Sequence, residues 1–179
     1  MYLDEVIGAG EIAISDLRAM DPSPRDLARV VTDCYVGGML AGKAKRAHFH
    51  VGDRDTRLQP LRDLLESFHV QPEWLYATHV ERSEKLMREA IDLAKRGAAV
   101  DIDVVEEDLP KWVRFYRENG GDPRQLTVSS DAAITSPRLV LEQIRRCVLE
   151  EGMPGAGTPR SSATMRARTS RTSVARSAM

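Results

Sequence analysis

The chain has 179 residues, of which 42% are hydrophobic and 30% are charged, and its formal net charge is −1. This composition is typical of a globular domain, and the charge gives no reason to expect nucleic acid or an anionic membrane as a partner. No apolar run approaches the roughly 20 residues that span a bilayer, and Asp4 and Glu5 stand where a signal peptide needs positive charge. Together with two distant cysteines, Cys34 and Cys147, these features predict a cytoplasmic protein with reduced thiols.

Short apolar segments alternate along the chain with longer segments of helical periodicity. The first predicted strand covers residues 5–15, and a helix begins after the Pro22–Pro24 segment, its end loosened by Gly37, Gly38 and Gly42. The following strand and helix pairs are predicted over residues 45–53 and 58–68, 74–80 and 83–96, 98–105 and 106–119, and 125–131 and 137–151.

Five strand-then-helix units in a row predict an α/β fold with a parallel sheet, either a doubly wound open sheet or part of a TIM-like (β/α)8 barrel. No glycine-rich nucleotide-binding loop follows any predicted strand, and potential metal ligands at strand ends favour the barrel. We predict this domain over residues 1–153. Residues 154–179 are rich in serine and arginine and have no apolar periodicity, which predicts a disordered basic tail.

Four of the predicted strands end in side chains that bind divalent metals. These are Glu11, His50, His79 and Asp131. Imidazole nitrogens and carboxylate oxygens are the usual donors to zinc and similar ions. A lone histidine at a strand end is more often structural than a ligand, but four such residues on four strands favour a metal site.

The segments GAGEIAISDLR, HFHVGD, THVER and VSSD, in this order and at these separations, resemble the amidohydrolase superfamily, and within it the isoaspartyl dipeptidase (β-aspartyl peptidase) family. The resemblance runs from about residue 4 to residue 135. It implies a distorted (β/α)8 barrel with two divalent metals, usually zinc, bridged by a carboxylated lysine or a glutamate. The implied reaction is hydrolysis of a β-aspartyl dipeptide, a small-molecule substrate, by a metal-bound hydroxide.

The resemblance also implies a role for each candidate residue. Glu11 matches the bridging carboxylate on the fourth barrel strand, and His50 and His79 match the ligands on the fifth and sixth. Asp131 matches the aspartate on the eighth strand, which binds metal and transfers a proton in catalysis.

Three further residues match positions that contact substrate. Arg18 and Arg82 match arginines that hold substrate carboxylates, and Thr135 falls where a substrate-contacting serine is expected. The family usually has histidine before the first arginine, where this chain has Leu17. From the residues alone, a surface ion pair is the alternative interpretation of each arginine.

The motif HFH raises the question of which histidine is a ligand. In this superfamily a His-x-His pair lies on the first barrel strand, whereas HFH matches the fifth, where one histidine binds metal. Residues two apart on a strand share a face, so His48 lies on the face of His50, about 6–7 Å deeper along the strand. We interpret His50 as the ligand and His48 either as a buried histidine beneath it or as one that supports the ligands without binding metal.

The match of Glu11 to the fourth strand implies that this chain spans about strands 4–8 and lacks the first three. We therefore expect one zinc ion at most, impaired activity, and self-association into a homo-oligomer that covers the sheet edges. The alternatives are a catalytically inactive remnant that acts through self-association and an amidohydrolase that acts on a cyclic amide.

Overall fold

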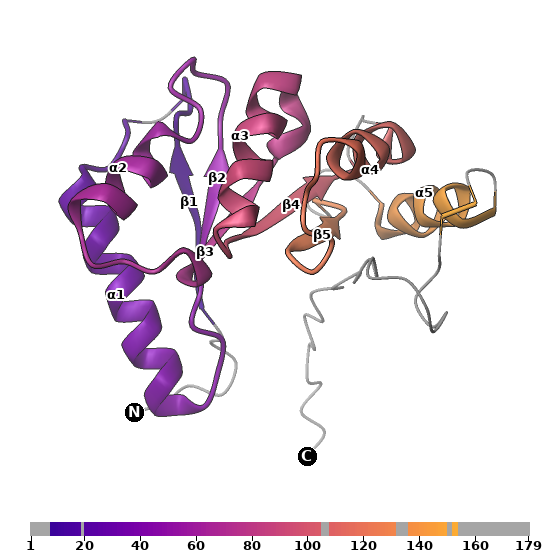
Figure 1. The fold of residues 1–179 in the computed structure, drawn as a ribbon. Helices are drawn as coiled ribbons and strands as arrows, with labels where there is room; N and C mark the ends of the chain where they lie inside the picture. Colours follow the sequence, from indigo (N-terminus) through magenta and orange to yellow (C-terminus); the bar gives the residue numbers. More distant parts are fainter. Residues whose placement is uncertain (1–7, 19, 105–107, 132–135, 150–151, 154–179) are drawn as a thin grey trace.

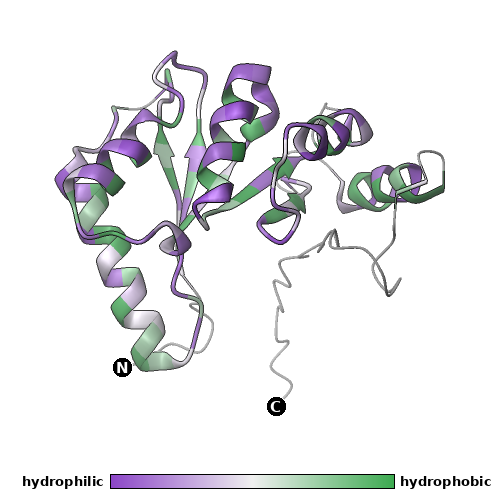
Figure 2. Cartoon of the chain, in the orientation of Figure 1, coloured by the Kyte–Doolittle hydropathy of each residue, from purple (hydrophilic) through white to green (hydrophobic). Residues whose placement is uncertain are grey.

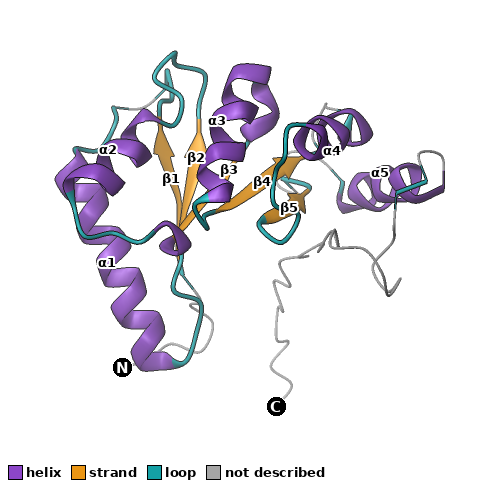
Figure 3. Cartoon of the chain, viewed as in Figure 1, coloured by secondary structure: helices purple, strands orange, loops and turns teal. Residues whose placement is uncertain are grey.

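The computed structural model describes residues 8–18, 20–104, 108–131, 136–149 and 152–153, in which strands and helices alternate (Figures 1 and 3). The strands are β1 (Ala9–Ile14), β2 (Ala47–Val51), β3 (Leu75–Thr78), β4 (Ala99–Asp103) and β5 (Leu126–Ser129). The α-helices are α1 (Pro24–Ala41), α2 (Gln59–Ser67), α3 (Glu84–Lys95), α4 (Leu109–Glu118) and α5 (Pro137–Leu149). Apart from α1, which begins at Pro24 and not after it, each of these elements lies within a segment predicted from the sequence. The short 3₁₀ helices η1 (Pro72–Trp74) and η2 (Val80–Arg82) were not predicted.

The five strands form one parallel sheet in the order β1-β2-β3-β4-β5 (Figure 1). A doubly wound sheet reverses its strand order at a switch point, and this sheet does not. Because right-handed crossovers that always advance in one direction leave every helix on the same face, the architecture is that of part of a (β/α)8 barrel.

The two faces of the sheet differ in chemistry. On β2, Ala47, Phe49 and Val51 are buried and join the hydrophobic core with residues of the helices. Figure 2 shows hydrophobic and hydrophilic residues alternating within the strands and helices. The residues that alternate with the core positions form the helix-free face, and they are His48, His50, Tyr76, Thr78, Asp101, Asp103, Thr127 and Ser129. From β2 to β5 this face is lined by polar side chains.

Asp101 organises the middle of the helix-free face. Its carboxylate is 1% exposed and accepts hydrogen bonds from the hydroxyl groups of Tyr76 (3.1 Å), Thr78 (2.9 Å), Thr127 (2.6 Å) and Ser129 (2.5 Å). Burial raises the pKa of Asp101, although the four hydroxyl contacts act in the opposite direction. These hydrogen bonds offset the free-energy cost of burying the carboxylate, and they link β3, β4 and β5 through polar side chains.

The N-terminus of α1 follows the predicted signals, but its C-terminal half does not. The hydroxyl of Ser23 accepts a hydrogen bond from the backbone amide of Asp26 at 3.3 Å, and Pro24 occupies the first turn. α1 continues through Gly37 and Gly38, so of the three glycines predicted near its end only Gly42 marks the end of the helix. It ends before Gly42, which adopts the left-handed conformation with φ of 65°.

Gly37 and Gly38 are adjacent in α1 but have different surroundings. A Cβ atom at Gly38 would lie 2.1 Å from the carbonyl oxygen of Ala44, whereas one at Gly37 would meet no atom within 4 Å. We predict that Gly37→Ala raises the free energy of unfolding by about 0.5–1 kcal/mol, because alanine has the higher helix propensity. Gly38→Ala should lower it by about 1–3 kcal/mol, because the backbone must move. Urea unfolding measures both variants, and effects of the same sign would contradict this packing.

Other expectations concern the cysteines, the termini and the membrane. Cys34 and Cys147 are not joined by a disulfide, as predicted. The predicted tail, residues 154–179, lies outside the described residues. None of the described helices is long and apolar enough to cross a membrane.

Candidate metal centre

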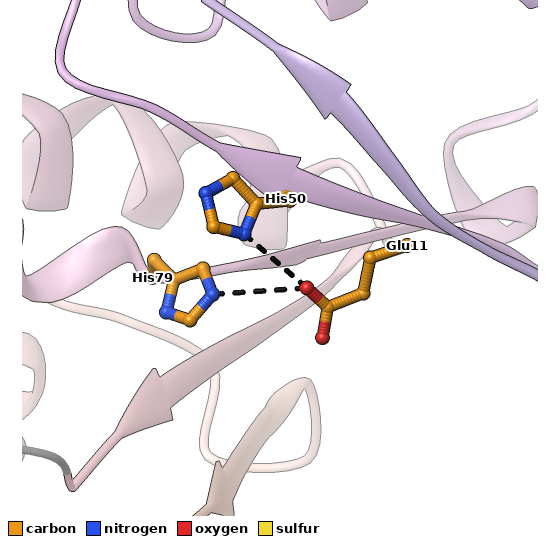
Figure 4. A group of neighbouring side chains, drawn as sticks. All are labelled: Glu11, His50 and His79. Carbon is orange, nitrogen blue, oxygen red and sulfur yellow. Dashed lines mark hydrogen bonds and ion pairs between the residues drawn. The ribbon is translucent and has the colours of Figure 1, made fainter. Parts of the chain in front are cut away.

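Three of the predicted ligands converge beside the carboxyl ends of neighbouring strands. Glu11 lies on β1, His50 on β2, and His79 directly after β3. Their ligand atoms all lie within 4.8 Å of one another. Figure 4 shows both imidazole rings beside the carboxylate of Glu11. Parallel strands that end at the same edge therefore bring together residues that are far apart in sequence.

A local irregularity of β1 places Glu11. The pairing of β1 with β2 shifts register between Ala9 and Ile12, which is the pattern of a β-bulge. Gly10 lies so close to β2 that a Cβ atom there would come within 2.4 Å of the Cβ of His48. Only glycine fits this approach, and the bulge re-aims the following side chain, Glu11, toward the ligand histidines.

His79 stands at a sharp change of backbone direction. Its φ of 64° lies in the left-handed region, which non-glycine residues seldom adopt, between β3 and η2. Its side chain is buried, with Nδ1 2.9 Å from Oδ2 of Asp103 and Nε2 3.8 Å from Oε2 of Glu11. Burial lowers the pKa of His79, but the contacts with Asp103 and Glu11 outweigh it and raise the pKa to about 9.

His50 contacts charged groups through both ring nitrogens. Nδ1 lies 3.2 Å from Oε2 of Glu11. Nε2 lies 3.2 Å from Oδ2 of Asp16 and 3.2 Å from Nη2 of Arg18. The ring also meets that of His79 edge to face, with 4.3 Å between the centroids. Glu11 is therefore shared by the two histidines, through Nδ1 of one and Nε2 of the other.

The chemistry of this group fits a divalent cation such as zinc. The contact with His79 holds the pKa of Glu11 at about 2, although partial burial acts in the opposite direction, so its carboxylate is ionised near neutral pH. Nε2 of His79 is buried and has no hydrogen-bond partner among the described residues. Buried polar atoms without a partner are rare, and a cation held by two imidazoles and a carboxylate would supply one.

Comparison with solved structures shows which proteins share this fold. The chain is similar to β-aspartyl dipeptidase from the thermophilic keratin-degrading Fervidobacterium islandicum AW-1, with a TM-score of 0.77 and 37% identity over 85% of this chain. For the structure of that enzyme in complex with a β-Asp-Leu dipeptide, the TM-score is 0.75 and the identity is 35% over 85% of this chain. These similarities are consistent with a fragment of an isoaspartyl (β-aspartyl) dipeptidase.

The match to the β-aspartyl dipeptidases covers only part of those proteins. This chain spans 43–44% of the length of the two matched chains. No protein-family model matches the sequence.

The two arginines predicted to contact substrate form ion pairs within this chain. Arg18 holds both carboxylate oxygens of Asp16, at 3.0 and 2.7 Å, while 73% of its side chain is exposed. This contact keeps the pKa of Asp16 well below its usual range. Arg82 donates to Oδ1 of Asp53 at 2.7 Å. The ion-pair interpretation describes both residues in this structure, and their role toward substrate stays a prediction.

The remaining predicted site residues lie outside the three-residue group. Asp131 follows β5 with φ of 42° and is half-buried, and it belongs to neither group of candidate ligands found among the described residues. Thr135 lies outside the described residues. His48 is also in neither group, and its ring stacks on Tyr76 with 4.5 Å between the centroids.

Sequence reasoning missed three acidic residues beside the histidines. Asp16 contacts His50, and a second buried group of candidate ligands contains His79, Glu81 and Asp103. Asp16 and Glu81 lie within the motifs SDLR and HVER, in which only the arginines were predicted to be functional. The alternation in AVDID could have placed Asp103 on the ligand face, because Ile102 between the two aspartates belongs to the core.

Proposed function

We propose that this chain forms part of the active site of a metal-dependent β-aspartyl dipeptidase that hydrolyses the isopeptide bond of β-aspartyl dipeptides. The observation that supports this most is the convergence of Glu11, His50 and His79 within 4.8 Å, in a chain 35–37% identical to β-aspartyl dipeptidases. Glu11, His50 and His79 would hold a divalent cation, most simply zinc. Such a cation supplies Lewis acidity toward the scissile carbonyl and toward water.

Residues of this chain would bind the substrate and move the proton. Arg18 and Arg82 would hold the carboxylates of the dipeptide, with Thr135 contributing a hydroxyl group. The side chain of Arg18 is well exposed, and its guanidinium group donates to the carboxylate of Asp16. A substrate carboxylate could replace that of Asp16 in this contact. Asp131 would accept a proton from the attacking water and deliver it to the leaving amine.

A second candidate is a non-catalytic role through association. Among the described residues, β1 and β5 are each paired on one side only, and an unpaired strand edge is a template for pairing with another chain. This candidate predicts concentration-dependent association without metal-dependent turnover.

Zinc content and turnover of the purified chain test these candidates together. We expect about one equivalent of zinc after loading and slow hydrolysis of β-Asp-Leu. A chelator should abolish this hydrolysis, and α-Asp-Leu should not be hydrolysed. Asp131→Asn is the matched variant, because it should retain zinc and lose turnover. A chain that binds no zinc and hydrolyses neither dipeptide would refute the catalytic proposal, and sedimentation velocity would then test the association.

Arginine substitutions test carboxylate recognition. We predict that Arg18→Ala and Arg82→Ala each weaken binding of β-Asp-Leu to the zinc-loaded chain about 10–100-fold, because each removes a charge-assisted contact with a substrate carboxylate. Arg124→Ala is the control. Like Arg18, Arg124 donates to an aspartate two residues earlier, Asp122, but it precedes β5 at the opposite end of the sheet. Isothermal titration calorimetry measures all three, and equal losses would contradict a specific role.

A further inference from the structure

His79 faces an acidic residue through each of its ring nitrogens. Nε2 points to Glu11 at 3.8 Å, with no hydrogen-bond partner among the described residues, whereas Nδ1 makes a 2.9 Å contact with Oδ2 of Asp103. The side chains of His79 and Asp103 are 6% and 2% exposed, so solvent water competes little for this contact. The two nitrogens therefore have different tasks.

We propose that Asp103 is a positioning residue that keeps a proton on Nδ1 of His79 and so presents Nε2 as the nitrogen that binds the cation. This inference rests on the proposed function. An ionised carboxylate only accepts hydrogen bonds, so a carboxylate beside Nδ1 requires that nitrogen to be the donor. With the proton of the neutral ring held on Nδ1, the lone pair is left on Nε2, on the side of Glu11.

The fold fixes Asp103 for this role. It is the last residue of β4, paired with Ser129 of β5, and its backbone amide donates to Oε2 of Glu81 at 3.2 Å. The other nearby carboxylate oxygen, Oε1 of Glu81, is 4.0 Å from Nδ1 of His79, which is too long for a hydrogen bond. Oδ1 of Asp103 has no hydrogen-bond partner among the described residues. Within the described part of the chain, Asp103 is thus the acceptor for His79.

A competing interpretation is that the buried group of His79, Glu81 and Asp103 holds a cation of its own. A cation there would take Nδ1 of His79 and displace the 2.9 Å hydrogen bond to Asp103. It would also leave Nε2 without the partner that the centre at Glu11 and His50 provides. The two interpretations differ in which nitrogen carries the proton.

Asp103→Asn and Asp101→Asn form a matched pair. Both aspartates lie on β4, on the same face, and both are buried, but the carboxylate of Asp101 is bound by four hydroxyl groups instead of His79. An asparagine amide both donates and accepts, so at position 103 it no longer dictates the tautomer of the ring. A loss that is merely structural would affect both variants.

The protonated nitrogen can be read directly by ¹⁵N NMR of the chain, whose four histidines are assigned with single-histidine variants. The metal-free chain is measured at about pH 10, above the pKa of about 9 for His79. We expect the proton on Nδ1 in the wild-type chain and in Asp101→Asn, and a mixture of tautomers in Asp103→Asn. A proton on Nε2 in the wild-type chain would overturn the inference even if neither variant folded.

Zinc competition titrations give the second readout. Asp103→Asn should weaken zinc binding about 10–100-fold, whereas Asp101→Asn should stay close to wild type. Equal losses in the two variants, or a second zinc equivalent that depends on Asp103, would overturn the positioning role. If the wild-type chain bound no zinc, the proposed function would fail, and the tautomer of the metal-free chain would still decide the role of Asp103.

Discussion

His79→Ala should lower the zinc affinity of the chain about 100-fold or more, and His50→Ala should do the same. Zinc held by four protein ligands is bound with about 10–16 kcal/mol, so one ligand contributes roughly 3 kcal/mol, which corresponds to a factor of about 100–1,000. In addition, removal of His79 leaves Asp103 buried without its partner. Competition with a fluorescent zinc chelator measures both affinities.

The control for this prediction is the other histidine of HFH. His48→Ala should keep most of the zinc affinity, because His48 stacks on Tyr76 and its Nε2 is buried away from the three-residue group. His69→Ala should have no effect, because His69 is exposed and outside both candidate groups. A loss in His48→Ala as large as that in His79→Ala would show that HFH binds metal as a pair.

Phe49→Ala should lower the free energy of unfolding by about 3–5 kcal/mol, a large part of the stability of a domain of this size. Phe49 is fully buried in β2 and lies between the two histidines of HFH, facing the helices. Truncation leaves a cavity that close-packed neighbours fill only in part. Urea denaturation monitored by circular dichroism gives the value.

Phe49→Leu separates packing from site chemistry. Because it keeps most of the apolar volume, it should cost less than about 1.5 kcal/mol. Zinc affinity measured where both variants are fully folded should change little, since Phe49 and the ligand histidine point to opposite faces. A small cost for Phe49→Ala would mean that this face of β2 is not packed as described.

The sequence predicted the elements well because their signals are local. The alternation in AHFHV and the helical spacing of Leu86, Met87, Ala90 and Ile91 reflect burial on one face, which the structure shows for both segments. In AVDID all five residues are buried, and the alternation separates apolar side chains from aspartates. Gly37 and Gly38 misled the prediction, because their cost in helix propensity is outweighed where Gly38 allows α1 to lie against Ala44.

The arrangement of the site depended on features with no local signature. Glu11, His50 and His79 could be named as ligands from residue type and strand position, and the structure brings these three together. The bulge before Glu11, the left-handed backbone of His79 and the contact between His79 and Asp103 arise from tertiary packing. Periodicity alone cannot reveal such features, because each depends on a strand distant in sequence.

The contrast between the two faces of the sheet also limits how this sequence can change. Within a strand, neighbouring positions have different constraints. Ile102 packs in the hydrophobic core, whereas Asp101 and Asp103 make polar contacts on the helix-free face. Substitution of a single residue alters the packing of one face and leaves the other face in place. Insertion or deletion of one residue inside β4 would exchange the two sets, turning carboxylates into the core and isoleucine out of it. During divergence, residues of these strands can therefore be substituted, whereas the number of residues in each strand is constrained.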